Sequence, residues 1–314
     1  MTFPHHRGAL LAAVACVLVG ASFTANGVLV DYPHAGGQAV RYGLACLLLL
    51  PAVARGAAAP LRALAPRQWL RLALLAAVGM VGFNLAVLAA ERTAEPAVPG
   101  VLVGCAPVVV AVLVPALDGR RPRRAVLAGA LAVAAGAFVI QGWGATDATG
   151  LAWSVAALGG EVGFAVLAVP LVRPLGPLLL TAVVCGVAAA EAALLGLALD
   201  GAGWLRAPAP DEAAALAWQA VVVTVVGFLC WYAGIQRIGT ERATLFSGLI
   251  PVSAALTAPL AGQGALRAAA LAGSLLVAAG VALGTGLLTA RARRDGPGGD
   301  GPARLDTPRA ARVG

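Results

Sequence analysis

The chain has 314 residues, of which 60% are hydrophobic and only 11% are charged, and its mean hydropathy is +0.89. A water-soluble domain of this length carries roughly a quarter charged residues, because its surface must be solvated. The composition therefore excludes a soluble globular protein and predicts that lipid covers most of the surface. The net charge of +8 does not indicate a nucleic-acid partner, because the charges lie in short clusters between long apolar runs.

Ten apolar runs are long enough to cross a bilayer, since a membrane helix needs about 20 apolar residues. The first run begins close to the N-terminus and exceeds the ~7–15 residues of a signal-peptide core, so we interpret it as a membrane helix. Charged and turn-forming residues separate the runs. The expected spans are 8–30, 36–54, 70–90, 97–117, 125–143, 150–171, 176–199, 213–235, 243–262 and 268–289.

The arginines predict the orientation of these spans. With the N-terminus in the cytoplasm, the external loops receive only Arg92, Arg206 and Arg267, and almost all other arginines are cytoplasmic. Positive charge is retained on the cytoplasmic side during insertion. We therefore expect a multi-pass protein of a bacterial inner membrane with both termini in the cytoplasm. The Gly-, Pro- and Arg-rich segment 291–314 has few apolar residues and is expected to form a disordered cytoplasmic tail.

The two halves of the chain resemble each other. Segment 127–136 (LAGALAVAAG) is matched by segment 271–280 (LAGSLLVAAG), which lies 144 residues further on. The same displacement places Pro107 on Pro251, and a one-residue gap places the Gly-Phe pair at 82–83 on the pair at 227–228. A shared register of prolines and glycines indicates an internal repeat.

The number of spans in each repeat determines their relative orientation. Residues 1–145 and 146–290 each hold five expected spans. Because five is odd, the two repeats must cross the membrane in opposite senses. The sequence therefore predicts an all-α integral membrane protein with about ten transmembrane helices, arranged as two inverted five-helix repeats. Secondary transporters with this plan bind substrate near the bilayer midplane between the repeats.

These features resemble the drug/metabolite transporter superfamily, in particular its ten-helix EamA-type branch. The resemblance rests on segment 41–45 (RYGLA) in the second span, segment 89–94 (AAERTA) after the third, the paired prolines and the repeated glycine-rich closing segments. Members often carry a Gly-Glu-Arg element after the fourth and ninth spans. Here those places read DGRRP (118–122) and AGQG (261–264), so a role of that glutamate is not carried over.

The resemblance implies a secondary transporter that works by alternating access, as an exporter or exchanger of a small metabolite, amino acid or drug-like molecule. Proton or substrate exchange often drives such carriers. The partners expected from it are the lipid bilayer, a small-molecule substrate and protons. The sequence names neither the substrate nor the oligomeric state, and a homodimer remains open.

Glu161 is the candidate for proton coupling. It lies near the middle of the sixth expected span, in the sequence Gly-Gly-Glu-Val-Gly. A charged carboxylate at that depth costs at least ~2.5 kcal/mol, so the side chain should face the bundle interior or a wet cavity. The alternative is a protonated glutamate that hydrogen-bonds a neighbouring helix.

Five residues are candidates for the substrate cavity: Arg41, Asn84, Trp231, Tyr232 and Ser247. Arg41 lies inside the second span, where it can snorkel outward or pair with a glutamate of the 91–95 segment or a substrate carboxylate. Asn84 and Ser247 are polar groups in apolar spans, for which hydrogen bonding between helices is the default. Trp231 and Tyr232 fit either an aromatic belt or a wall that stacks on a cyclic substrate.

Pro107 and Pro251 are candidate hinges. Each removes one helix hydrogen bond in the middle of a span, and the two are repeat partners, which favours a paired role over coincidence.

The sequence argues against enzymatic function. No zinc motif, P-loop or nucleophile elbow stands in a fitting context, and we expect no catalytic residues, no metal and no cofactor. A channel is the alternative to a carrier, although channels build pores from repeated rings of polar groups and no such ladder is present. An intramembrane enzyme is a more distant alternative.

Overall fold

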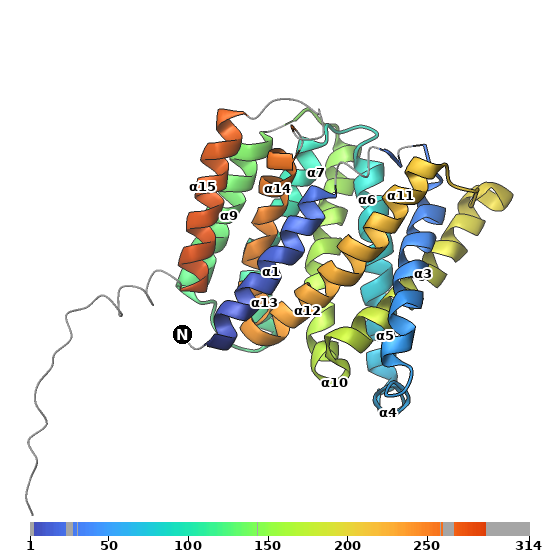
Figure 1. Ribbon diagram of the computed structural model, residues 1–314. Helices are drawn as coiled ribbons and strands as arrows, with labels where there is room; N and C mark the ends of the chain where they lie inside the picture. Colours follow the sequence, from blue (N-terminus) through green and yellow to red (C-terminus); the bar gives the residue numbers. More distant parts are fainter. Residues whose placement is uncertain are drawn as a thin grey trace, which may run out of the picture.

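The computed structural model describes residues 3–22, 28–29, 31–142, 144–257, 259 and 267–286, and within these the chain is a bundle of helices (Figure 1). The expected tail at 291–314 lies outside the described residues. The helices of the first half are α1 (Phe3–Ala21), α3 (His34–Val53), α4 (Ala58–Arg62), α5 (Pro66–Ala76), η1 (Ala77–Gly82), α6 (Phe83–Ala90), α7 (Ala97–Gly104), α8 (Ala106–Leu117) and α9 (Arg124–Gln141). Those of the second half are α10 (Ala148–Asp200), η2 (Gly201–Gly203), α11 (Pro210–Trp218), η3 (Gln219–Val226), α12 (Gly227–Ile238), α13 (Thr240–Ala243), η4 (Thr244–Gly248), α14 (Leu249–Thr257) and α15 (Ala268–Thr285).

These elements combine into about ten helices that can span a membrane. In the described part of the chain, seven stretches are long and apolar enough by length and composition. The longest of them, α10, contains two of the expected spans, because its backbone leaves the helical region at Gly176 (φ 69°, ψ 164°) between Pro174 and Pro177. The positive φ favours glycine at this position. With the shorter α1 and the α13–α14 segment, the fold is the predicted all-helical membrane bundle.

The ends of several spans differ from the expected ones. The first helix ends at Ala21 rather than near residue 30, and the ninth span is not one regular helix. It begins at Thr240, passes through the 3₁₀ segment η4 and resumes as α14. Hydropathy locates the apolar run but not the hydrogen-bonding pattern within it, so these irregularities were not predicted.

The two halves exchange packing partners. In the first half, the α5–α6 span lies antiparallel to the first arm of α10, where Gly79 approaches the Phe164 backbone and Gly160 approaches Phe83. In the second half, α12 packs in the same way on α1, where Gly234 approaches Ala12. The third span thus packs on the sixth as the eighth packs on the first, which is the arrangement that two inverted repeats produce.

The closing helices of the two halves, α9 and α15, lie antiparallel along one edge of the bundle (Figure 1). Small residues allow their backbones to approach closely. A Cβ atom added at Gly129 would lie 2.5 Å from the carbonyl oxygen of Gly280, and one at Gly273 would lie 2.6 Å from that of Gly136. The matched glycine-rich segments of the sequence therefore pack against each other.

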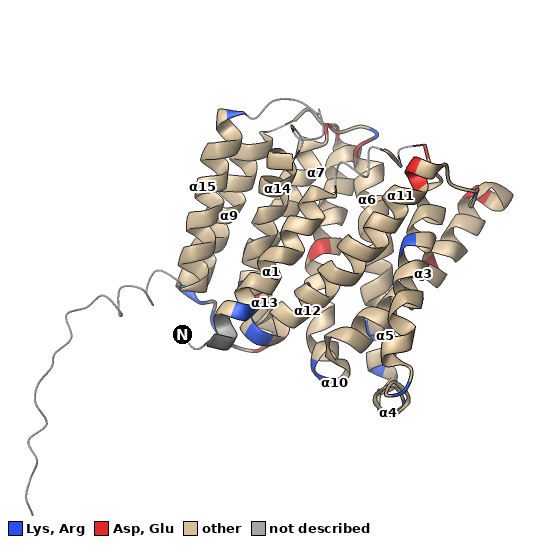
Figure 2. Ribbon diagram, viewed as in Figure 1, with Lys and Arg blue, Asp and Glu red and all other residues tan. Residues whose placement is uncertain are grey.

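Charged residues gather at the two ends of the bundle (Figure 2). Most arginines lie at one end, which carries α4, the turn of α10 at Gly176 and α13; we call this the basic end. The loop 91–96 and the segment 201–212 lie at the opposite end, where most of the acidic residues are found.

Candidate functional site

Two π-helical segments interrupt the third and eighth spans at corresponding places. The segment η1 ends immediately before Phe83, and η3 ends immediately before the matching Gly-Phe pair at 227–228. Asn84 donates a hydrogen bond to the carbonyl of Met80 (2.7 Å), and Thr224 donates one to the carbonyl of Gln219 (2.9 Å). Side chains thus bond to main-chain carbonyls in or beside both segments. Such π segments are frequent at functional sites.

Neighbouring residues of α3 contact both of these spans. Arg41 donates from Nε to Thr224 Oγ1 at 2.8 Å, and its guanidinium lies 5.2 Å from the centre of the Tyr42 ring. The Tyr42 hydroxyl accepts a hydrogen bond from Asn84 at 3.3 Å. The structure therefore brings two candidate residues, Arg41 and Asn84, to one polar cluster with Tyr42 and Thr224. The ion pair of Arg41 with a glutamate of the 91–95 segment, considered from sequence, is not formed in the described structure.

An aromatic cluster lies between α10 and α12. The ring centres of Phe164, Phe228 and Tyr232 are 5.1 to 6.0 Å apart. Tyr232 is fully buried and Trp231 is 5% exposed, so neither occupies a lipid-facing belt. The Tyr232 hydroxyl and the Trp231 indole nitrogen are buried without a hydrogen-bond partner among the described residues. Packing on Phe164, which is far away in sequence, places the rings of Phe228 and Tyr232 inside the bundle.

Glu161 lies halfway along the first arm of α10, about 20 Å of helix from Ala148 and from Gly176. No described residue forms a hydrogen bond or an ion pair with it, and Cys16 of α1 lies within electrostatic reach. Phe164 follows one helical turn later, so the carboxylate and the aromatic cluster share a face of α10. The structure thus places Glu161 next to α1.

The remaining candidates lie in the fourth and ninth spans. Ser247 is buried and donates to the carbonyl of Thr244 at 2.8 Å, so its partner belongs to its own helix. The helix of the fourth span breaks at Cys105, two residues before Pro107, and that of the ninth changes from 3₁₀ to α at Leu249, two residues before Pro251. Each proline therefore stands in the first turn of a new segment, where its missing N–H is not needed. The two breaks are repeat partners, as the prolines are.

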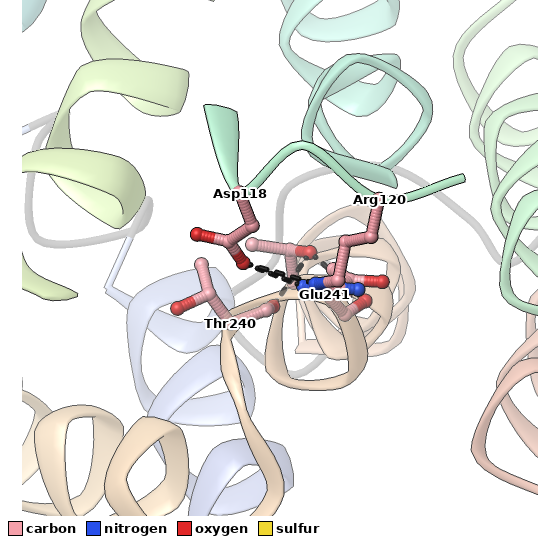
Figure 3. A network of polar contacts seen from close by, with 5 residues as sticks. Asp118, Arg120, Thr240 and Glu241 are labelled. Atoms are coloured by element: carbon pink, nitrogen blue, oxygen red, sulfur yellow. Dashed lines mark hydrogen bonds and ion pairs between the residues drawn. The ribbon is translucent and has the colours of Figure 1, made fainter. Parts of the chain in front are cut away.

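An ion pair joins the two halves at the basic end (Figure 3). Arg120, in the loop between α8 and α9, pairs with Asp118 of the same loop at 2.9 Å and with Glu241 of α13. The hydrogen bonds from Arg120 to Glu241 and Asp118 raise the pKa of the guanidinium. Thr244 secures this end of α13 by donating to the carbonyl of Thr240 (3.0 Å). Sequence reasoning missed this contact, because Glu241 comes from the other half of the chain.

A second contact joins the halves at the opposite end. The Tyr32 hydroxyl, just before α3, donates to the carbonyl of Arg206 at 2.7 Å, and the Arg206 guanidinium lies 4.8 Å from the centre of the Tyr32 ring. Arg206 also forms a two-pronged ion pair with Glu212 of α11. Each end of the bundle therefore carries a polar contact that involves an arginine and joins the first and second halves.

No group of three or more His, Cys, Asp and Glu side chains among the described residues is placed to hold a metal ion. The five cysteines are free thiols.

Comparisons with known proteins follow the same division of the chain. A family model described as the EamA-like transporter family matches twice, at residues 6–142 and 149–285. A search of curated protein sequences returned no significant match. One solved crystal structure, titled only as that of a protein, is similar with a TM-score of 0.76 and 22% sequence identity, over 89% of this chain and 98% of that one. At this identity the structural match shows a shared fold.

Proposed function

This chain belongs to the EamA-like transporter family and is therefore a secondary transporter of a small molecule rather than an enzyme, and we propose that it exports or exchanges its substrate by alternating access. The exchanged packing of the two halves is the observation that carries this proposal. Two similar halves of opposite orientation can adopt two related arrangements, each of which opens a central site to one side of the membrane.

The two polar contacts at the ends of the bundle support this cycle. The Arg120–Glu241 pair joins the halves at the basic end, and the Tyr32–Arg206 contact joins them at the other. Both arginine side chains are more than 40% exposed. Exposed ion pairs contribute little to stability and can be broken and remade. We assign each contact to closing its own end of the carrier.

Glu161 is the proposed proton carrier. The role is supported by its position at half-depth beside α1, where it has no ion-pair or hydrogen-bond partner among the described residues. The aromatic cluster one turn away supplies an apolar wall for the substrate, and the paired helix breaks before Pro107 and Pro251 supply the bending points. The distribution of arginines supports a cytoplasmic basic end in a bacterial inner membrane.

The proposal is tested with purified protein in proteoliposomes under an imposed pH gradient, by screening small metabolites, amino acids and drug-like compounds for proton-coupled flux. We expect one or more to show saturable flux that is stimulated by counter-substrate. Flux without saturation or counterflow would instead identify a channel.

For the identified substrate, we expect Glu161→Gln to abolish proton-driven flux while substrate exchange remains measurable. The matched control is Glu191→Gln, which changes a glutamate in the other arm of α10. If Glu161→Gln has the pH dependence of the unmodified protein, the assignment of the proton carrier is wrong.

A further inference from the structure

Three polar side chains form a stripe along the first half of α3. His34, Gln38 and Arg41 follow one another at a spacing of four and three residues, which places them on one face of the helix. His34 and Arg41 lie within electrostatic reach of each other. We call these three residues the α3 polar stripe. It runs from the end of the span that faces away from the basic end toward the middle of the bundle.

Two members of the stripe carry polar atoms that are buried and unpaired. Among the described residues, the Nε2 atom of His34 and the Oε1 atom of Gln38 have no hydrogen-bond partner, although neither atom is accessible to solvent. Gln38 is only 9% exposed. A buried polar group without a partner costs free energy, so a native structure that retains two of them in one line requires an explanation. A ligand that pairs with them supplies one.

Arg41 is drawn inward rather than toward the membrane surface. Its partner Thr224 is fully buried and lies at the middle of the span 210–238, about 20 Å of helix from either end. A snorkelling arginine would extend toward the near end of its helix instead. The contact with Thr224 therefore excludes snorkelling for Arg41 and places the guanidinium beside the π segment η3.

The described part of the chain offers Arg41 no ion-pair partner. No carboxylate among the described residues forms an ion pair with it, and its only hydrogen bond there runs from Nε to Thr224. The two terminal nitrogens, which form the fork that binds a carboxylate with two parallel hydrogen bonds, are left for another group. A single uncompensated cation in a membrane span is matched by a single negative charge, because a dianion would leave net charge in a low-dielectric site.

We propose that the α3 polar stripe recognises a small monocarboxylic acid, whose carboxylate pairs with Arg41 and whose hydrogen-bond donor is accepted by Gln38. His34 extends the stripe to the end of the span that lies opposite the basic end. This inference rests on the proposed transport function and specifies its substrate class.

The test measures ligand stabilisation of the purified full-length protein in detergent. The probes are lactate, 3-hydroxybutyrate and N-acetylglycinate, each of which carries a donor, compared with their primary amides. We expect at least one acid to raise the melting temperature while its amide does not. Equal effects of acids and amides, or no stabilisation by any acid, would overturn the proposal.

Variants of the stripe residues then test whether the stabilising acid binds at the α3 polar stripe. Arg41→Gln should raise the dissociation constant of the stabilising acid by about 30-fold or more, because a buried charge pair is lost. Gln38→Leu should weaken binding, and Arg92→Gln, an exposed arginine outside the spans, should leave it unchanged. Arg41→Lys keeps the positive charge and serves as a control for a folding defect in Arg41→Gln. It should bind the acid, but more weakly than the unmodified protein. Undiminished binding by a folded Arg41→Gln variant would refute the role of Arg41.

The flux assay separates this inference from the transport proposal. Binding of an acid without any carrier-type flux would contradict the transport mechanism alone. Saturable flux of an uncharged or cationic solute, without competition by any of the acids, would contradict the substrate class alone.

Discussion

The close packing of α9 on α15 makes a strong prediction about a single methyl group. In Gly129→Ala, the new Cβ would lie 2.5 Å from the carbonyl oxygen of Gly280 and 2.7 Å from the Cα of Gly284. Both are main-chain atoms of a regular helix and cannot rotate away. A carbon and an oxygen in contact are about 3.3 Å apart at closest, so the two helices must separate locally by roughly 1 Å.

The loss of stability follows from the van der Waals contacts that this separation removes along the interface. A gap of 0.5–1 Å forfeits about a quarter to a half of each van der Waals contact that it opens, and such contacts, rather than a hydrophobic driving force, hold membrane helices together. Overpacking of a close-packed interior typically costs about 1–3 kcal/mol. We expect Gly129→Ala to destabilise the protein within that range.

The assay is thermal unfolding of the purified protein in detergent, together with the yield of monodisperse protein from membranes. The matched control is Gly159→Ala, the same substitution in α10, where an added Cβ meets no atom within 4 Å. Gly129→Ala should melt well below the unmodified protein and Gly159→Ala close to it. If both variants melt at the same temperature, the two closing helices do not pack as described.

Two further predictions concern the ends of the bundle. In a cysteine-free background, a cysteine introduced at the buried Ala243 should react faster with a membrane-impermeant maleimide in the Glu241→Gln variant, because the ion pair with Arg120 no longer holds the basic end closed. Exchanging the two charges should restore slow labelling. Equal labelling rates in all variants would argue against a closing role for this ion pair. Asp147, which caps α10, accepts a hydrogen bond from the Gly150 amide, and this bond lowers the pKa of its carboxyl from 3.8. The stabilisation is therefore present above pH 3.8 and is lost as the pH falls through the lowered pKa. Asp147→Ala should melt below the unmodified protein at neutral pH, with a difference that shrinks in acid; a difference independent of pH would contradict this.

The bundle could be predicted from sequence because the bilayer leaves a chain few choices. Backbone groups in lipid must be satisfied internally, so long apolar runs become helices. The matched glycine segments at 127–136 and 271–280 also indicated the repeat, and they prove to be the two faces of the α9–α15 interface. A break between the spans expected at 150–171 and 176–199 was also predicted, and the structure places the turn at Gly176.

The candidate site was only partly predictable, because its contacts join residues far apart in the chain. Arg41 was identified as a candidate, but its partner Thr224 lies 183 residues away, and nothing in the sequence links the two residues. Trp231 and Tyr232 fitted an aromatic belt as well as a cavity wall, and only the folded structure, in which Tyr232 packs on Phe164, shows that both are buried. The repeated Gly-Phe pairs mark the corresponding places of the two π segments. Hydropathy does not reveal that the hydrogen bonding there is π-helical.

The missing family glutamate gains a physical interpretation from the basic end. The loop after the fourth span has no glutamate, but Glu241 of the other half supplies a carboxylate to Arg120 in that loop. A carrier of the proposed kind must populate both of its conformations, so the contacts that close its two ends must be similar in free energy. The Arg120 and Glu241 side chains are 41% and 13% exposed, and the contact at the other end is a hydrogen bond from the Tyr32 hydroxyl to the main-chain carbonyl of Arg206. Neither contact is a deeply buried ion pair, which would hold its end closed, so the two bias the equilibrium between open ends little.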